Sequence, residues 1–79
     1  MYNGHKNWNH WNVALWIGND PGLYALAKEC LRTEPNRARA ARAFMDALEA
    51  DAPDWTKPHT CDGAPFTVTS VRAAMRDLS

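Results

Sequence analysis

The sequence predicts an all-α fold: a compact single domain of about four helices, spanning residues 1–79, with one long proline-rich loop. Apolar residues recur at spacings of three and four in four segments, as on amphipathic helices. Residues that favour helix starts precede those segments. A chain of 79 residues with 46% hydrophobic and 23% charged side chains is globular, and is too short for more than one domain.

The first predicted helix is capped by Asn7 or Asn9 and ends at Gly18–Asn19, where both residues tolerate a left-handed conformation. Apolar residues cover more than half of its surface, which is typical of a central helix. Three of the four tryptophans of the chain lie on it: Trp8, Trp11 and Trp16. Because each tryptophan can bury roughly 150–250 Å², we expect them at the centre of the core.

The second helix is predicted to start with Asp20 as its N-cap and Pro21 as its first residue. Its buried stripe consists of Leu23, Leu26, Ala27, Cys30 and Leu31. A similar signal, with Thr33 before Pro35, predicts a third helix from about Pro35 to Ala50. The apolar face expected for it consists of Ala38, Ala41, Phe44, Met45 and Leu48.

Prolines and glycine interrupt residues 51–65, which are therefore expected to form a loop, with Trp55 attaching it to the core. The fourth helix is predicted from near Val68 to Leu78, capped by Thr67 or Thr69. Its apolar seam consists of Val68, Val71, Met75 and Leu78.

Asn12 places a polar amide between Trp8 and Trp16 on the first helix. A buried amide must find hydrogen-bond partners, and we expect backbone groups of the loop that ends at Pro65. The alternative is that Asn12 contacts a ligand directly.

The third helix carries its charges against the helix dipole. Arginines lie in its N-terminal half and acidic residues in its C-terminal half, whereas the dipole favours the reverse order. The candidate partner-binding residues are Arg37, Arg39, Arg42, Asp46 and Glu49. Two interpretations remain open: salt bridges within the fold, such as Arg42 with Asp46, or an arginine-centred surface that recognises a partner.

Two further groups of arginines accompany that cluster. Arg32, at the end of the second helix, can extend it. Arg72 and Arg76 form a second basic stripe at i, i+4 on the fourth helix, or simply a solvated helix face.

The sequence predicts neither a metal site nor a catalytic centre, and no cofactor. The possible zinc ligands are His5, His10, His59 and Cys61, but their spacing lacks the paired pattern of structural zinc sites. No spacing selects a nucleophile with a base, and no glycine-rich phosphate loop is present. We therefore expect a protein that is not an enzyme and has no small-molecule substrate.

The charge balance and the cysteine content indicate the expected cellular location and the expected classes of partner. Nine basic and nine acidic residues give zero net charge, which makes direct nucleic-acid binding an unfavoured expectation. The polar start of the chain, the lack of a long apolar run and only two cysteines predict a cytoplasmic protein with reduced thiols and no membrane contact.

A specific motif lies in the first part of the chain, where residues 11–20 read Trp-Asn-Val-Ala-Leu-Trp-Ile-Gly-Asn-Asp. This segment resembles a family of short phage and prophage proteins with the motif Asn-x-x-Thr-Trp-Asn-Val-x-Leu-Trp-x-x-Asn-Asp. The resemblance covers about residues 2–31. His10 departs from it, since the family usually has Thr there, and this departure puts a threonine-dependent cap in doubt.

Within that neighbourhood, the whole chain is similar to small anti-CRISPR proteins that act on type I systems. The resemblance implies an inhibitor that binds a Cas subunit, with type I-C as the first candidate, and it supplies no catalytic residues. An arginine anchor would suit an acidic partner surface, whereas Asp46 and Glu49 would suit a basic, DNA-binding one.

Two other functions stay open. A small helix-turn-helix regulator is one, because the corner from Gly18 to Pro21 is tight and Arg37 and Arg39 begin the third helix. The other is an accessory phage protein that acts by protein binding, possible as a homodimer because so short a chain gains buried area by self-association.

Overall fold

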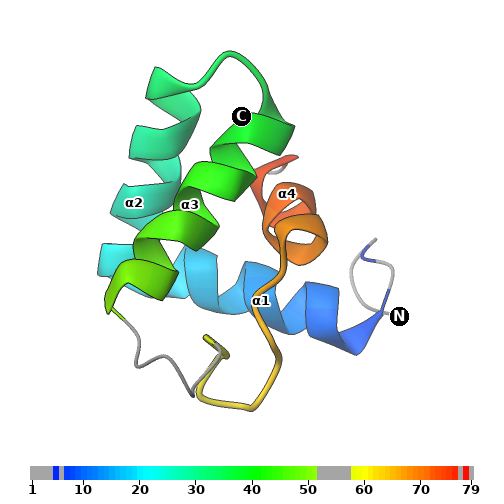
Figure 1. The fold of residues 1–79 in the computed structure, drawn as a ribbon. Helices are drawn as coiled ribbons and strands as arrows, with labels where there is room; N and C mark the ends of the chain where they lie inside the picture. Colours follow the sequence, from blue (N-terminus) through cyan, green and yellow to red (C-terminus); the bar gives the residue numbers. More distant parts are fainter. Residues whose placement is uncertain (1–4, 6, 52–57, 77, 79) are drawn as a thin grey trace.

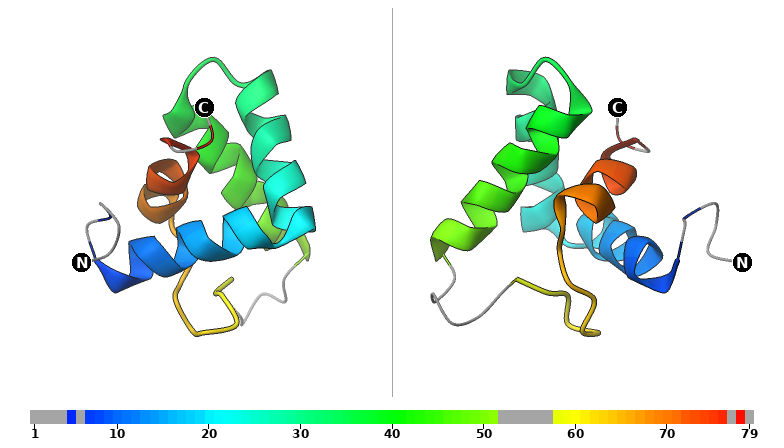
Figure 2. Two further views of the ribbon diagram at one scale, coloured as in Figure 1. Left: turned by 180° about the vertical axis from the view of Figure 1, so that it is seen from behind. Right: turned by 45° about the vertical axis from the view of Figure 1, so that its right-hand side comes forward.

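The computed structural model describes residues 5, 7–51, 58–76 and 78, and these residues form an all-α domain, as predicted. The helices are α1 (Trp8–Asn19), α2 (Pro21–Thr33), α3 (Arg37–Asp51) and α4 (Val68–Arg76). Helices α2 and α3 form an antiparallel hairpin, and α1 lies across one end of it (Figure 1). Helix α4 packs against both α1 and α3 (Figure 2).

Three of the four helix starts are those that the sequence predicts. The Asn7 side chain accepts a hydrogen bond from the backbone N–H of His10 at 3.0 Å. The Asp20 side chain accepts from the N–H of Gly22 at 2.8 Å, next to Pro21 in the first turn of α2. At α4, Thr67 and Ser70 cap reciprocally: each side-chain oxygen accepts from the other residue's backbone N–H at 3.0 Å.

The predicted start of α3 is wrong. Its cap is Asn36, whose side chain accepts from the N–H of Arg39 at 2.8 Å, while Thr33 is the last residue of α2. The Thr33 hydroxyl donates instead to the carbonyl of Glu29 at 3.1 Å. Since Ser, Thr and Asn all cap well, local chemistry does not choose between Thr33 and Asn36.

The buried face of α3 differs from the predicted one at Ala38. Ala40, Ala41 and Phe44 are fully buried, whereas Ala38, which was predicted to belong to the apolar face, is exposed. Helix α3 ends at Asp51, one residue beyond the prediction. Helix α4 ends at Arg76, two residues before it, although its predicted seam is buried at Val71 and Met75.

The tryptophans do not form the centre of the core, contrary to the prediction. Trp8 is 39% exposed, and Trp11 and Trp16 are half-buried. Among the described residues, the largest fully buried side chain is Phe44 of α3, and other large, fully buried side chains are Ile17, Met75, Val13 and Val71. Trp55 lies outside the described residues.

The reason lies in how α1 is used. Neighbouring helices cover one face of α1, where Asn12, Val13 and Ile17 are buried, and leave its outer face to solvent with Trp8 and Leu15. The apolar surface of α1 is therefore larger than the area that its two neighbours, α2 and α4, can cover. In the part of the chain that the structure describes, no helix is long and apolar enough to cross a membrane.

Candidate functional site

The buried amide of Asn12 attaches the loop before α4 to α1. Its Oδ1 accepts a hydrogen bond from the Thr60 hydroxyl at 2.5 Å, and its Nδ2 donates to Asp62 Oδ2 at 2.8 Å. The indole Nε1 of Trp16 donates to the same Asp62 oxygen at 3.0 Å. Asn12 thus binds the predicted loop, but its partners are side chains where backbone groups were predicted.

This network changes the pKa of the Asp62 carboxyl group. The hydrogen bonds from Asn12 and Trp16 lower the pKa of Asp62 below its ordinary value of 3.8, because they stabilise the charged form. The loop itself closes on Thr60, whose hydroxyl accepts from the N–H of Ala64 at 3.0 Å. Within residues 7–20, Asn7, Asn12, Trp16 and Asp20 therefore stabilise the fold, through two caps and one hydrogen-bond network.

The cap at Asn7 does not depend on the side chain at position 10, so α1 starts without the threonine-dependent cap that the sequence put in doubt. The backbone N–H of His10 makes the capping bond, and a backbone group is unaffected by the change of side chain. The imidazole of His10 lines a surface groove instead. The charged surfaces of α3 and α4 lie outside these structural residues.

The candidate residues on α3 divide into two sets. Arg39, Arg42, Asp46 and Glu49 are exposed on one face of the helix, which we call the α3 face. A shallow groove of about 240 Å³ runs along it, lined by Glu34, Arg39, Arg42, Ala43 and Asp46. Arg37 lies on the other side of α3, because two residues correspond to a turn of about 200°.

The predicted salt bridge on the α3 face is not formed. Among the described residues, no ion pair joins Arg42 to Asp46. Arg32, which was considered an extension of the cluster, is used within α2: its guanidinium donates to Glu29 at 3.0 and 2.5 Å. This pairing lowers the pKa of Glu29 and raises the pKa of Arg32.

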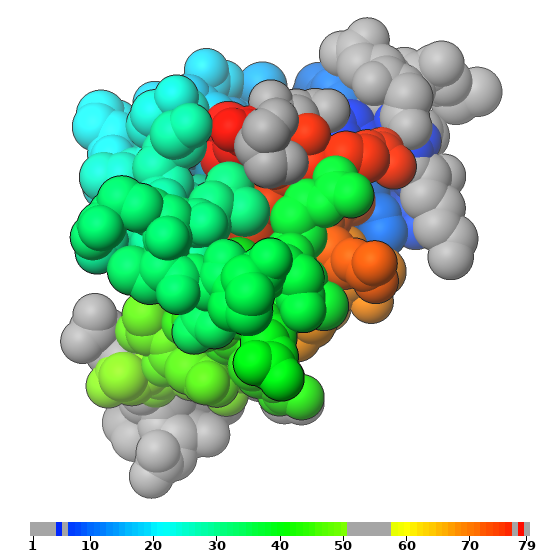
Figure 3. Space-filling model, turned by 90° about the horizontal axis from the view of Figure 1, so that it is seen from above, coloured from blue at the N-terminus to red at the C-terminus, as the bar shows by residue number. Residues whose placement is uncertain are grey.

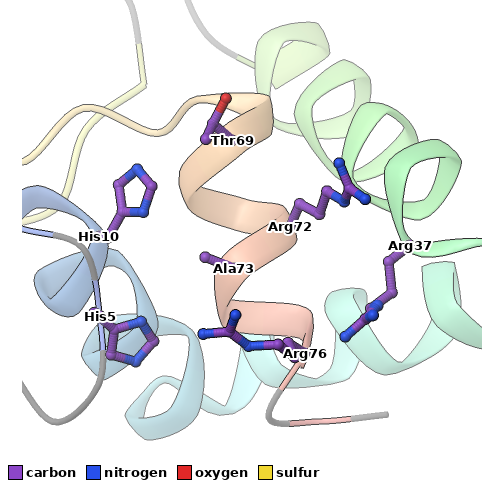
Figure 4. Close-up of a pocket in the computed structure, with 7 residues that line it drawn as sticks. All are labelled: His5, His10, Arg37, Thr69, Arg72, Ala73 and Arg76. Carbon is purple, nitrogen blue, oxygen red and sulfur yellow. The ribbon is translucent and has the colours of Figure 1, made fainter.

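Arg37 belongs to a second surface, formed over the exposed side of α4. Figure 3 shows α4 in orange and red between α3 in green and α1 in blue. The groove there has a volume of about 380 Å³ and we call it the α4 groove. Its described lining residues are His5, His10, Arg37, Thr69, Arg72, Ala73 and Arg76 (Figure 4).

The fold thus joins two basic groups that the sequence keeps apart. Arg72 and Arg76 come from α4, and Arg37 comes from the first turn of α3. The described residues that line the groove include no carboxylate. The i, i+4 spacing in the sequence predicts that Arg72 and Arg76 share one side of α4, but no local signal predicts that Arg37 lies beside them.

The possible metal ligands fall into separate places. His5 and His10 line the α4 groove, whereas His59 and Cys61 lie in the loop near Trp16 and Phe66. In the described segments, no three His, Cys, Asp or Glu side chains gather as a metal site would require. Cys30 and Cys61 are free thiols, and burial, with the nearby Glu29 and Glu34, raises the pKa of Cys30.

The two features that suggested a helix-turn-helix also lie apart. The corner at Gly18–Pro21 and the arginines that begin α3 lie at opposite ends of α2 (Figure 1). A helix of 13 residues separates them by about 20 Å. They do not form one DNA-binding unit, because in a helix-turn-helix the recognition helix directly follows the turn.

Comparison with known proteins places the chain in a family. Residues 1–79, the whole sequence, match the family of unknown function DUF7249. The chain belongs to this family. No curated protein matches it, and no solved structure matches it either. The description of DUF7249 assigns no activity.

Proposed function

We propose that this DUF7249 protein is a phage-derived, non-catalytic anti-CRISPR inhibitor that acts in the host cytoplasm. It binds a Cas subunit of a type I interference complex and blocks target DNA binding or nuclease recruitment. The resemblance of the motif at residues 11–20 to phage proteins supports the target class. The observation that carries a binding role is the α3 face, whose charges are not used to hold the fold together.

The α3 face has the composition that a protein-binding surface needs. Arg39 and Arg42 precede Asp46 and Glu49 in one exposed row, with no ion pair between Arg42 and Asp46 among the described residues. Arginine is enriched among interface residues that dominate binding energy, because its planar group makes paired hydrogen bonds to carboxylates. The acidic end of the same row is complementary to a basic surface that binds DNA.

A plaquing assay tests this proposal. Cells that express the chain together with a phage-targeting type I-C system are compared with a matched type I-F panel. We expect plaquing to be restored with type I-C. Failure in both panels, with the protein present in the soluble extract, would contradict the proposal.

Charge reversals then locate the surface. We expect Arg39→Glu with Arg42→Glu, or Asp46→Lys with Glu49→Lys, to abolish the rescue, depending on the sign of the partner surface. Lys28→Glu with Arg72→Glu is the matched control for the arginine pair, since both side chains are exposed on helices other than α3 and the net charge changes equally. Rescue that survives both reversals on α3 would remove the α3 face from the interface.

A further inference from the structure

The outer side of α1 carries three large apolar residues and a glycine in one row, which we call the α1 stripe: Trp8, Trp11, Leu15 and Gly18. We propose that this stripe binds the same stripe of a second copy of the chain, with the two α1 helices antiparallel. The dimer goes beyond the proposed function, because it uses neither the α3 face nor a Cas subunit. Either proposal can therefore fail without the other.

The α1 stripe faces away from the core. Trp8 is 39% exposed and Leu15 is 38% exposed, Gly18 is exposed and Trp11 is half-buried. Among the described residues, the only other exposed large hydrophobic side chain is Tyr24 of α2. In the left view of Figure 2, no other helix passes in front of α1. Clustered apolar area with tryptophan is typical of a surface that binds protein.

The spacing of the α1 stripe is the same in both directions along the helix. The intervals between its four residues are three, four and three, as in the narrow seam along which helices pack in coiled coils. In an antiparallel pair about a twofold axis, Trp8 of one copy therefore lies opposite Gly18 of the other. Trp11 lies opposite Leu15 in the same way.

The sizes of the facing residues are complementary. The indole of Trp8 meets Gly18, where an added Cβ would have no atom from another part of the chain within 4 Å. Helices pack closely when large residues of one face small residues of the other. A parallel pair would set Trp8 against Trp8 and glycine against glycine, so one end would be overfilled and the other left empty.

The absence of charge on α1 also favours a second copy as the partner. None of the 12 residues from Trp8 to Asn19 is Asp, Glu, Lys or Arg. A twofold axis sets each surface against itself, so a charge near the axis would meet an equal charge. A charged partner would lose the hydration of its charges on this stripe and find no opposite charge in return.

The α3 face is the competing surface for self-association. Its residues have the same spacing, so an antiparallel pair would set Arg39 against Glu49 and Arg42 against Asp46. Exposed ion pairs contribute little to binding and are screened by salt. Burial of apolar side chains contributes more and is not screened, which favours the α1 stripe and makes salt a test.

The size of α1 sets the expected strength of the dimer. A helix of 12 residues is about 18 Å long and about 10–12 Å wide with its side chains. One face of it covers less than the roughly 800 Å² that each partner buries in a stable complex. We therefore expect a reversible dimer with a dissociation constant between about 1 μM and 1 mM.

Sedimentation equilibrium of the full chain, from about 5 μM to about 1 mM, tests the proposal. We expect the mass to rise with concentration from one chain of 8.9 kDa toward twice that value. The rise should persist in about 1 M NaCl, because apolar contacts are not screened. A monomer mass over the whole range would overturn the proposal.

Gly18→Leu is the sharpest variant, because it fills the space that receives Trp8 of the partner while the surroundings of Gly18 within the chain are open. We expect it to raise the dissociation constant by about tenfold or more. Asn9→Leu is the matched control, since it adds the same side chain at an exposed position about 100° from Trp8 around α1. Circular dichroism checks that both variants are folded. Equal dimerisation of the two variants would overturn the proposal.

Nuclear Overhauser effects test the orientation without any variant. Trp8 and Gly18 of one helix lie about 15 Å apart along its axis, too far for such an effect. In a mixture of isotope-labelled and unlabelled chains, we expect an intermolecular effect between the Trp8 ring and the Gly18 α-protons. Contacts between two Trp8 rings alone would overturn the antiparallel pairing. A dimer that dissociates in 1 M NaCl and with Arg39→Glu would overturn it in favour of the α3 face.

Discussion

Asn12 shows how one side chain connects parts of the chain that are about fifty residues apart. Both ends of its amide are used, one by the Thr60 hydroxyl and the other by Asp62. A buried amide without partners would cost the fold its full desolvation penalty, whereas a satisfied one fixes a single position of the loop. The asparagine of the motif is therefore explained by the loop that it holds.

Asn12→Ala is expected to lower the free energy of unfolding by about 1–3 kcal/mol, because it leaves buried polar groups of the loop without a partner. Urea denaturation followed by circular dichroism measures the change. Asn9→Ala is the matched control on the same helix; Asn9 is exposed, and we expect a change within about 0.5 kcal/mol. Equal effects of the two substitutions would contradict the structural role of Asn12.

Asp62 predicts a dependence of stability on pH. Its pKa is lower in the folded state than in the unfolded chain, so its charge stabilises the fold above about pH 4, and this contribution is lost as pH falls through the folded pKa. We expect the difference in unfolding free energy between the unaltered chain and Asp62→Asn to shrink from about pH 6 to about pH 2.5. Trp16→Phe, which removes one donor, should reduce the same pH dependence. A difference that is constant with pH would refute this assignment.

Helix α3 shows that local signals predict the existence of a helix better than its first residue. Two possible caps, Thr33 and Asn36, lie three residues apart, and both have suitable side chains. The structure uses Asn36, because α2 continues through Thr33 and residues 34–36 form the turn between α2 and α3. Tertiary packing decides between caps of similar strength.

Asn36→Ala is expected to destabilise the domain by about 1 kcal/mol, since it removes the side chain that caps α3. Thr33→Ala at the end of α2 should change stability by less than about 0.5 kcal/mol, because its exposed hydroxyl bonds a carbonyl that water can also satisfy. Thermal and urea unfolding of both variants measure the contrast. The reverse order of effects would place the cap at Thr33.

The whole molecule centres its core on α3 rather than on the tryptophans of α1. Phe44 is completely buried and lies 6.2 Å from Phe66, measured between ring centroids. Its helix contacts both α2 and α4, so a side chain on its inner face meets neighbours on two sides. Composition indicates which residues are large and apolar, but the number of covering elements decides which of them are buried.

Phe44→Ala is expected to cost about 3–5 kcal/mol, through lost burial and the cavity that remains. A domain of this size has a total stability of roughly 4–12 kcal/mol, so this variant should be largely destabilised. Trp8→Ala, at a side chain 39% exposed, should cost less than about 2 kcal/mol. Urea denaturation measures the loss of stability of both variants. A larger loss for Trp8→Ala than for Phe44→Ala would indicate that the core is centred on α1.

The net charge of the whole molecule is zero, but its surface carries two separate charged regions. The α3 face carries both signs in one row, whereas the described lining of the α4 groove carries basic residues and no acidic ones. The sequence placed Arg37 with Arg39 and Arg42, because the three are close along the chain. The fold separates them, since a turn of about 200° directs Arg37 to the side where α4 lies.

The sequence by itself determined the all-α class, the cap at Asp20, the choice of Asn7 or Asn9 and of Thr67 or Thr69 as the caps of α1 and α4, and the burial of Val71 and Met75. These features depend on neighbours within about four residues, whose preferences are local. Only the tertiary structure decided the partners of Asn12, the start of α3, the exposure of Trp8 and the meeting of Arg37 with Arg72. Each of these depends on which helix faces which, and that is set by the packing of the four helices together, a property that no single segment carries.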